Sequence, residues 1–209
     1  MFCYIFGALP VKSFDFKITE NDIIIAADSG IKNTDKFNIS PDFVIGDFDS
    51  LGYNPHGENV ITHPIEKDDT DTLLAVKYAV DKGYKNFRIF GCIGGRLDHT
   101  FANIQTAFYI ANLGGNAVFY GDDENFTVVR NNKIEFDEAC SGNVSVFALE
   151  SCDNVTIKGL HYEIENGKLT PDFPLGVSNN FINKKSSISV EDGTLLIIWE
   201  KQNIKGAKI

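Results

Sequence analysis

The sequence predicts an α/β domain with a mostly parallel, Rossmann-like sheet, followed by an all-β sandwich. Two observations carry this prediction: strands alternate with helices over about the first 120 residues, and the rest consists of short segments rich in β-branched residues. The pattern changes near residues 121–124, without a low-complexity linker. We therefore expect an α/β domain of residues 1–121, with helices on both faces of its sheet, and a β-sandwich of residues 122–209.

Uninterrupted apolar runs and glycine stops define the elements of the first domain. Two segments have apolar residues at helical spacing: one helix is expected over residues 70–82 and ends at Gly83, and the other over residues 96–115 ends at Gly114 and Gly115. Buried strands are expected at residues 3–9, 22–30, 43–47, 60–64, 86–91 and 116–123.

Short alternating segments separated by turn residues define the second domain. Asn and Gly pairs predict turns at residues 131–132 and 166–167, and Asp192–Gly193 predicts a third. The last seven residues, "NIKGAKI", are expected to be a frayed tail. Strands are expected at residues 126–131, 133–136, 144–150, 154–159, 160–169, 186–191 and 194–200.

Composition excludes several classes of protein. The chain has 209 residues and a net charge of −10, which argues against a nucleic-acid partner but not against a nucleotide, since metal ions can supply the counter-charge. No apolar stretch approaches the roughly 20 residues of a membrane span, and the start of the chain reads as a strand and not a signal peptide. Four cysteines without CxxC pairs indicate reduced, mostly buried thiols in a cytoplasmic protein.

Acidic residues follow the ends of several predicted strands. Asp28 follows "IIIAA", Asp47 and Asp49 follow "FVIG", and Asp71 belongs to the acidic start of a helix. Because ligands bind beyond the carboxyl ends of strands in open α/β sheets, these side chains are expected at one edge. Carboxylates that converge in this way repel each other unless cations neutralise them, and Mg²⁺ with phosphate is the usual solution.

Glycines and basic residues add the features of a phosphate site. Gly94 and Gly95 follow the strand "FRIF" and allow backbone N–H groups to approach an anion. Lys67 and Arg96 add phosphate donors. Each feature also has a simpler interpretation, because an Asp at a helix start is usually a cap, a D-x-D after a strand is often a turn, and a single Arg is usually a surface charge. Their combination favours Mg²⁺–nucleotide chemistry.

Five motifs together resemble the thiamine pyrophosphokinase family. They are "AADSG", "PDFVIGDFDS", "KDDTDT", "GCIGGRLDHTFANIQ" and "LGVSNNF", in this order along the chain. The resemblance implies an α/β domain followed by a β-sandwich that binds thiamine and forms the dimer. It also implies transfer of the pyrophosphoryl group of ATP to thiamine with Mg²⁺, giving thiamine diphosphate and AMP, in a homodimer with a shared active site.

The resemblance also implies roles for individual residues. Asp47, Asp49 and Asp71 are expected to hold Mg²⁺, and Lys67 and Arg96 to steady the transferring group. Asp71 or Asp69 is expected to accept the hydroxyl proton, and the sequence leaves this choice open. The residues expected around the nucleotide are Asp28, Gly94, Gly95, Arg96, Asp98 and His99, of which His99 is equally compatible with a helix surface. The positions expected around thiamine are Ser178, Asn179 and Trp199, the last serving either as a stacking surface or as a packed strand residue.

Two other functions remain open. D-x-D motifs also bind metal in other nucleotide-using transferases, such as those that act on nucleotide sugars. A second alternative is a non-catalytic module that binds a nucleotide or thiamine. Release of AMP from ATP in the presence of thiamine would separate the pyrophosphokinase from both.

Overall fold

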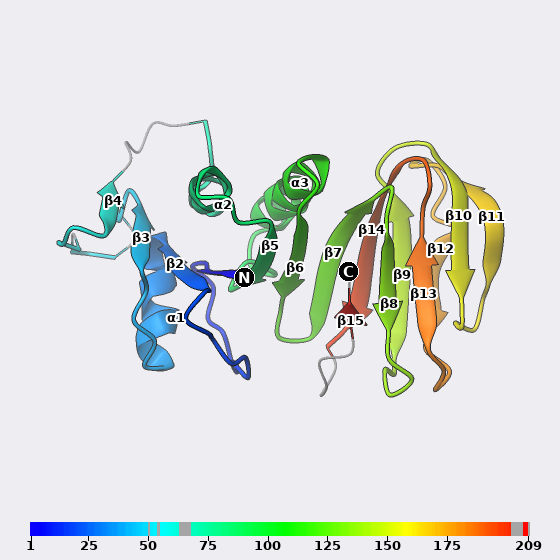
Figure 1. Ribbon diagram of the computed structural model, residues 1–209, viewed down its shortest axis with the longest axis horizontal. Coiled ribbons are helices and arrows are strands. Elements are labelled where there is room, and N and C mark those ends of the chain that lie inside the picture. Colours follow the sequence, from blue (N-terminus) through cyan, green and yellow to red (C-terminus); the bar gives the residue numbers. More distant parts are fainter. Residues whose placement is uncertain (50, 54, 63–67, 202–206, 209) are drawn as a thin grey trace. The chain divides into compact units, whose positions relative to one another are not determined.

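The computed structural model describes residues 1–49, 51–53, 55–62, 68–201 and 207–208. It contains two compact units (Figure 1). The first comprises Met1–Ile110 and Ala117–Asp122, and the second comprises Ala111–Asn116 and Asp123–Ile209. Within the described part of the chain, no helix is both long enough and apolar enough to cross a membrane.

The first unit is built on a largely parallel sheet, as predicted. Its strands are β1 (Cys3–Phe6), β2 (Ile23–Ala27), β3 (Phe43–Gly46), β4 (Val60–Thr62), β5 (Asn86–Phe90) and β6 (Asn116–Tyr120), arranged in the order β6-β5-β1-β2-β3-β4. The pairs β1–β2, β1–β5, β2–β3 and β3–β4 are all parallel. Every residue of β1 and β2 is buried, which explains why these strands read as uninterrupted apolar runs.

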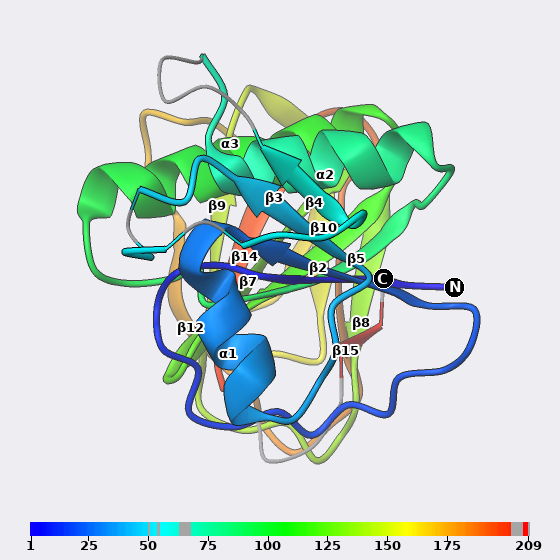
Figure 2. The ribbon, with the colours of Figure 1, turned by 90° about the vertical axis from the view of Figure 1, so that its left-hand side faces the viewer.

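Helices cover both faces of this sheet. The 3-10 helix η1 (Asp28–Gly30) leads into α1 (Ile31–Lys36), and the longer helices are α2 (Asp71–Asp81) and α3 (Leu97–Asn112). Figure 2 shows α1 on one face and α2 and α3 on the other. Helix α1 was not predicted, because six residues are too few to display a helical period.

The connection from β1 to β2 has no helix and covers the sheet with aromatic side chains instead. Phe14 packs edge-on against Phe90 at 5.2 Å between ring centroids, and Phe16 lies 4.9 Å from Tyr120. The guanidinium of Arg88 stacks over the ring of Phe16 at 4.6 Å. Phe14 and Phe16 are partly buried, so each contributes a part of the roughly 1.5–3 kcal/mol of a fully buried aromatic ring. Their packing covers the sheet in place of a helix.

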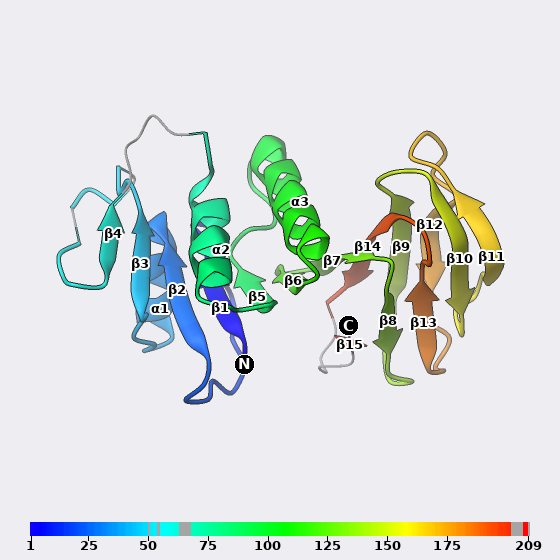
Figure 3. The same cartoon turned by 45° about the horizontal axis from the view of Figure 1, so that its top comes forward.

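The second unit is a β-sandwich of antiparallel strands. Between residues 123 and 208, the described residues form only strands and their connections (Figure 3). The ring of Phe136 in one sheet lies 5.4 Å from that of Trp199 in the other. One sheet has the order β12-β9-β14-β7 and the other β11-β10-β13-β8-β15. The strands are β7 (Glu124–Arg130), β8 (Lys133–Phe136), β9 (Asn143–Ala148), β10 (Cys152–Lys158), β11 (Ile164–Leu169), β12 (Gly176–Asn180), β13 (Ser186–Ser189), β14 (Thr194–Glu200) and β15 (Ala207–Lys208).

Several local predictions for the second unit were wrong. Asn166 and Gly167 do not form a turn but lie inside β11, where Asn166 has φ 50° and the register against β10 shifts. This is a β-bulge, which accepts the same residue types as a turn. Strand β12 was missed because "GVSNN" is mostly polar, and residues 207–208, expected to be frayed, pair with β8. All four cysteines are buried free thiols, as predicted.

Candidate active site

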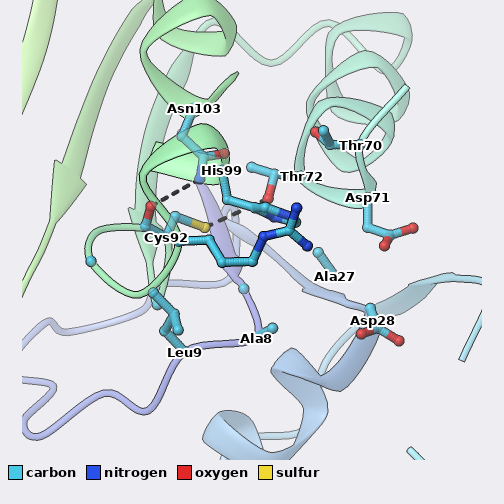
Figure 4. Close-up of a pocket in the computed structure, with 14 residues that line it drawn as sticks. Ala8, Leu9, Ala27, Asp28, Thr70, Asp71, Thr72, Cys92, His99 and Asn103 are labelled. Atoms are coloured by element: carbon cyan, nitrogen blue, oxygen red, sulfur yellow. Dashed lines mark hydrogen bonds between the residues drawn. The ribbon is translucent and has the colours of Figure 1, made fainter. Parts of the chain in front are cut away.

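A cavity of about 360 Å³ opens at the carboxyl ends of the strands of the first unit. It lies where the strand order reverses, because β2 and β5 flank β1 on opposite sides. Open α/β sheets bind their ligands at such a switch point. The residues around the cavity come from the segments after β1, β2 and β5 and from the first turns of α2 and α3 (Figure 4).

Three carboxylates gather next to this cavity, as predicted from the strand ends. One oxygen from each of Asp28, Asp47 and Asp49 lies within 4.8 Å of the others. Gly46 allows this approach, because a Cβ at that position would lie only 2.9 Å from the Cα of Asp28. Asp28 itself is only 8% exposed and has φ 48°, a conformation that non-glycine residues rarely adopt.

The residue between the paired aspartates explains the D-x-D pattern. Phe48 is 3% exposed and packs in a core cluster with Val44 and Leu51. While Phe48 turns inward, Asp47 is half-buried and Asp49 is exposed, and the N–H of Asp49 donates to Asp47 Oδ1 at 3.4 Å. In the D-x-D pattern, the middle residue therefore packs in the core, and a carboxylate lies on either side of it.

Asp71 lies beside this cluster at the start of α2. Figure 4 shows the carboxylates of Asp28 and Asp71, carried by η1 and α2, on the same side of the cavity. Among the described residues, the grouped carboxylates are those of Asp28, Asp47 and Asp49. A metal contact of Asp71 stays a prediction. Asp69 is held by Lys77 at 2.6 Å. The predicted Lys67 lies outside the described residues.

The loop after β5 has the backbone expected of an anion site. Gly94 and Gly95 have φ 96° and 65°, and Gly94 lines the cavity. Arg96 and His99 also line it, but both side chains are exposed. Arg96 donates two hydrogen bonds to Asp98, at 3.1 and 2.5 Å. These bonds hold the pKa of Asp98 below its usual value and fix the guanidinium at the rim of the cavity.

Polar residues deeper in the cavity were not singled out from the sequence. Asn103 donates from Nδ2 to the carbonyl oxygen of Cys92 at 2.8 Å, and Thr72 Oγ1 lies 3.6 Å from Cys92 Sγ. Figure 4 shows both contacts. Burial raises the pKa of Cys92 to about 11, so the thiol is neutral at pH 7. Buried Asn and Thr inside helices follow no recognisable pattern, so nothing in the sequence singled them out.

The three positions expected to bind thiamine lie in the second unit and have different environments. Ser178 is exposed with φ 59°. Asn179 is 4% exposed, and its side chain bonds to both backbone groups of Tyr162, at 2.9 and 2.7 Å. Trp199 is 3% exposed and contacts Phe136, so it contributes to the interior of the sandwich. Their contacts with a substrate stay predictions.

The fold and the cavity define a class of protein, an α/β enzyme with a β-sandwich appended to it. Comparisons with known proteins define it further. The family model described as "Thiamin pyrophosphokinase, catalytic domain" matches residues 14–119, and "Thiamin pyrophosphokinase, vitamin B1 binding domain" matches residues 131–195. The chain therefore belongs to the thiamine pyrophosphokinase family and is an enzyme of this type.

Individual relatives agree with this assignment. Thiamine pyrophosphokinase of Bacillus subtilis (strain 168) is 26% identical over 189 residues, which cover 86% of this chain and 87% of that protein. A crystal structure of thiamine pyrophosphokinase from Bacillus subtilis has a TM-score of 0.83 at 22% identity, covering 97% of this chain and all of that one. The structure from Geobacillus thermodenitrificans has a TM-score of 0.79 at 24% identity, with 97% and 99% covered.

Proposed function

We propose that this enzyme transfers the pyrophosphoryl group of ATP to the hydroxyl of thiamine, giving thiamine diphosphate and AMP. The observation that carries the proposal is the group of carboxylates at the switch-point cavity, beside a glycine loop and a guanidinium. The hydroxyl oxygen of thiamine forms a bond to the β-phosphorus, and the bond from that phosphorus to the α–β bridging oxygen breaks. AMP leaves with that oxygen.

The residues present fit a divalent cation. Asp28, Asp47 and Asp49 offer three carboxylate oxygens within 4.8 Å of one another, and hard cations such as Mg²⁺ prefer oxygen ligands. We assign Mg²⁺ to these three residues, with Asp71 as an additional ligand or base at the adjoining wall. When bound, Mg²⁺ supplies neutralising charge for the phosphates.

The protein's own groups align the reactants and move one proton. The backbone of Gly94 and Gly95 and the guanidinium of Arg96 bind phosphate oxygens at the rim of the cavity. Asp71 accepts the proton of the thiamine hydroxyl. The ion pair of Asp69 with Lys77 of α2 supports this choice of Asp71 over Asp69, because it engages the Asp69 carboxylate with a lysine.

A homodimer is part of the same proposal. Large apolar side chains remain exposed around β12, with Phe173 63%, Leu175 53% and Val177 43% exposed. A second copy of the chain would bury such a surface. The molar mass in solution, measured by light scattering, is expected to be twice that of the chain.

A coupled assay of AMP release tests the reaction. ATP, Mg²⁺ and thiamine together are expected to yield AMP and thiamine diphosphate in equal amounts, and omission of thiamine or chelation of the metal is expected to stop AMP release. Release of ADP instead of AMP, or equal release with and without thiamine, would overturn the proposal. A sugar acceptor in place of thiamine distinguishes it from other D-x-D transferases.

A further inference from the structure

The segment after β1 forms one wall of the cavity but has no helix or strand of its own. Gly7, Ala8 and Leu9 line the cavity, and the chain continues without regular structure to the start of β2. Two backbone bonds tie the segment to β5 and the glycine that follows it: Gly7 N–H donates to the carbonyl of Phe90 at 2.7 Å, and Leu9 N–H to that of Gly91 at 3.0 Å. These bonds fix only one side of the segment.

Two side chains of α1 hold the other side: Asn33, and Lys36, whose Nζ donates to the carbonyl oxygen of Val11 at 2.7 Å. Asn33 is 5% exposed and makes three hydrogen bonds to this segment. Its Nδ2 donates to the carbonyl oxygens of Gly7 at 2.8 Å and Leu9 at 2.9 Å, and its Oδ1 accepts from the N–H of Val11 at 3.0 Å. One amide thus satisfies three backbone groups that would otherwise have to find other partners.

The neighbouring glycines support a close fit at this place. A Cβ at Gly91, which has φ 67°, would lie 2.6 Å from the oxygen of Leu9 and 3.2 Å from Nδ2 of Asn33. A Cβ at Gly30, at the start of α1, would collide with the carbonyl oxygen of Phe6. The segment after β1 is therefore held between α1 and the loop after β5, with no room for a side chain on either glycine.

We infer that Asn33 is a positioning residue for the nucleotide: it holds the wall formed by Gly7, Ala8 and Leu9 in the shape that binds ATP. This inference rests on the proposed function. Asn33 is not itself among the residues that line the cavity, so it acts through the backbone that it holds. Its loss loosens the wall and weakens ATP binding, while the carboxylates after β2 and β3 keep their places and the chemical step continues.

Replacement of Asn33 tests the inference against a purely structural role. Asn33→Ala removes all three bonds and is expected to raise both the Kd of Mg·ATP, measured by calorimetry, and its KM by about tenfold. The kcat and the KM of thiamine are expected to change by less than about threefold. Asn33→Asp keeps an oxygen for the N–H of Val11 but loses both donors, so it should bind ATP no better than Asn33→Ala.

Asp22 provides a matched control at the far end of the same segment. Its carboxylate accepts from the N–H groups of Phe2 at 2.7 Å and Thr19 at 2.9 Å. Asp22→Asn weakens a comparable set of backbone contacts away from the cavity, so it should lower the Tm and leave ATP binding unchanged. If Asp22→Asn and Asn33→Ala raise the Kd of ATP equally at equal loss of Tm, or if Asn33→Asp restores binding, the inference is wrong.

A measurement on the unmodified protein covers the case in which Asn33→Ala does not fold. Mg·ATP is expected to slow hydrogen exchange in residues 7–12 by about tenfold, because a ligand against the wall stabilises the bond from Val11 to Asn33. Residues 17–22 serve as the internal reference. Equal exchange of residues 7–12 with and without ATP would overturn the inference. Failure of the proposed function would give a different result, because the unmodified protein would then release no AMP from ATP and thiamine.

Discussion

The two units place the polar side chains of their expected site residues differently. In the first, the strands are followed by residues whose polar side chains line a cavity, such as Asp28 after β2 and Arg96 after β5. In the second, Asn179, one of the two polar residues expected to contact substrate, is buried and bonds to the backbone of Tyr162. A parallel sheet releases its strands at one edge, whereas an antiparallel sandwich must satisfy its connecting loops locally. The difference predicts that mutations of the site residues in the first unit affect catalysis more than stability. Mutation of Asn179 is expected to affect stability more than catalysis.

The largest expected effect tests the catalytic side of this comparison. Asp49→Ala and Asp71→Ala should each lower kcat by about 10²–10⁴-fold, because the metal and proton-accepting contacts proposed for them would act on the transferring group. Asp81 lies at the other end of α2 and is exposed. Asp81→Ala should retain normal AMP release. Wild-type turnover in both Asp49→Ala and Asp71→Ala would show that the active site does not lie at this edge of the sheet.

At alkaline pH, the buried thiols of the two units should contribute differently to the pH dependence of the unfolding free energy. In the unfolded chain the thiol of Cys92 loses its proton near the ordinary cysteine pKa of 9.0, while burial keeps the folded thiol protonated to about pH 11. Its contribution to stability is therefore complete below pH 9 and is lost as the pH rises through 11, a change of at most about 3 kcal/mol. Denaturant titrations between pH 8 and 11 measure it.

Two variants make this comparison specific. Cys92→Ala should flatten the pH dependence of the unfolding free energy, whereas Cys152→Ala in the second unit should flatten it less, because the pKa of Cys152 is raised by burial but lowered by its backbone contacts with Thr194 and Glu150. Identical slopes for the wild type and Cys92→Ala would contradict the assignment.

Asn179→Ala should act on stability. Its side chain makes three hydrogen bonds, two to Tyr162 and one to the N–H of Asn180, so its removal is expected to lower the unfolding free energy by about 2 kcal/mol. Ser178→Ala removes an exposed hydroxyl and should change that free energy by less than about 0.5 kcal/mol. A raised KM for thiamine in Asn179→Ala at unchanged Tm would instead indicate direct contact with the substrate.

The smallest expected effect on stability concerns Asp98. Both partners of its ion pair with Arg96 are largely exposed, so Asp98→Asn should leave the Tm unchanged. The substitution removes the hydrogen bonds that orient Arg96, so the KM for ATP should rise about threefold. Arg96→Ala should raise it further. A lower Tm in Asp98→Asn would show that this pair has a structural role.

Strands and helices with a clear period could be predicted from sequence, and those without one could not. The buried strands of the first unit and helix α3 follow directly from apolar runs and spacing. Helix α1 and strand β12 are too short or too polar to display a period. Asn166 and Gly167 were misjudged because the same residues that form turns also form bulges.

The residues of the site also differ in whether the sequence could predict them. Asp47 and Asp49 were predictable, because acidic residues directly after a buried strand have a known direction. The contacts of Asn33 were not, since its three partners are backbone groups more than 20 residues away in sequence. Backbone partners leave no mark on residue identity, so only the fold reveals them.

The burial of Phe48 has a consequence for how the enzyme responds to heat. The two flanking aspartates owe their spacing to the packing of one phenylalanine against Val44 and Leu51. Warming that loosens this small cluster would spread the carboxylates before the sheet melts. Turnover should then decline at temperatures where circular dichroism still reports an intact fold, and Phe48→Leu should bring that decline to lower temperatures.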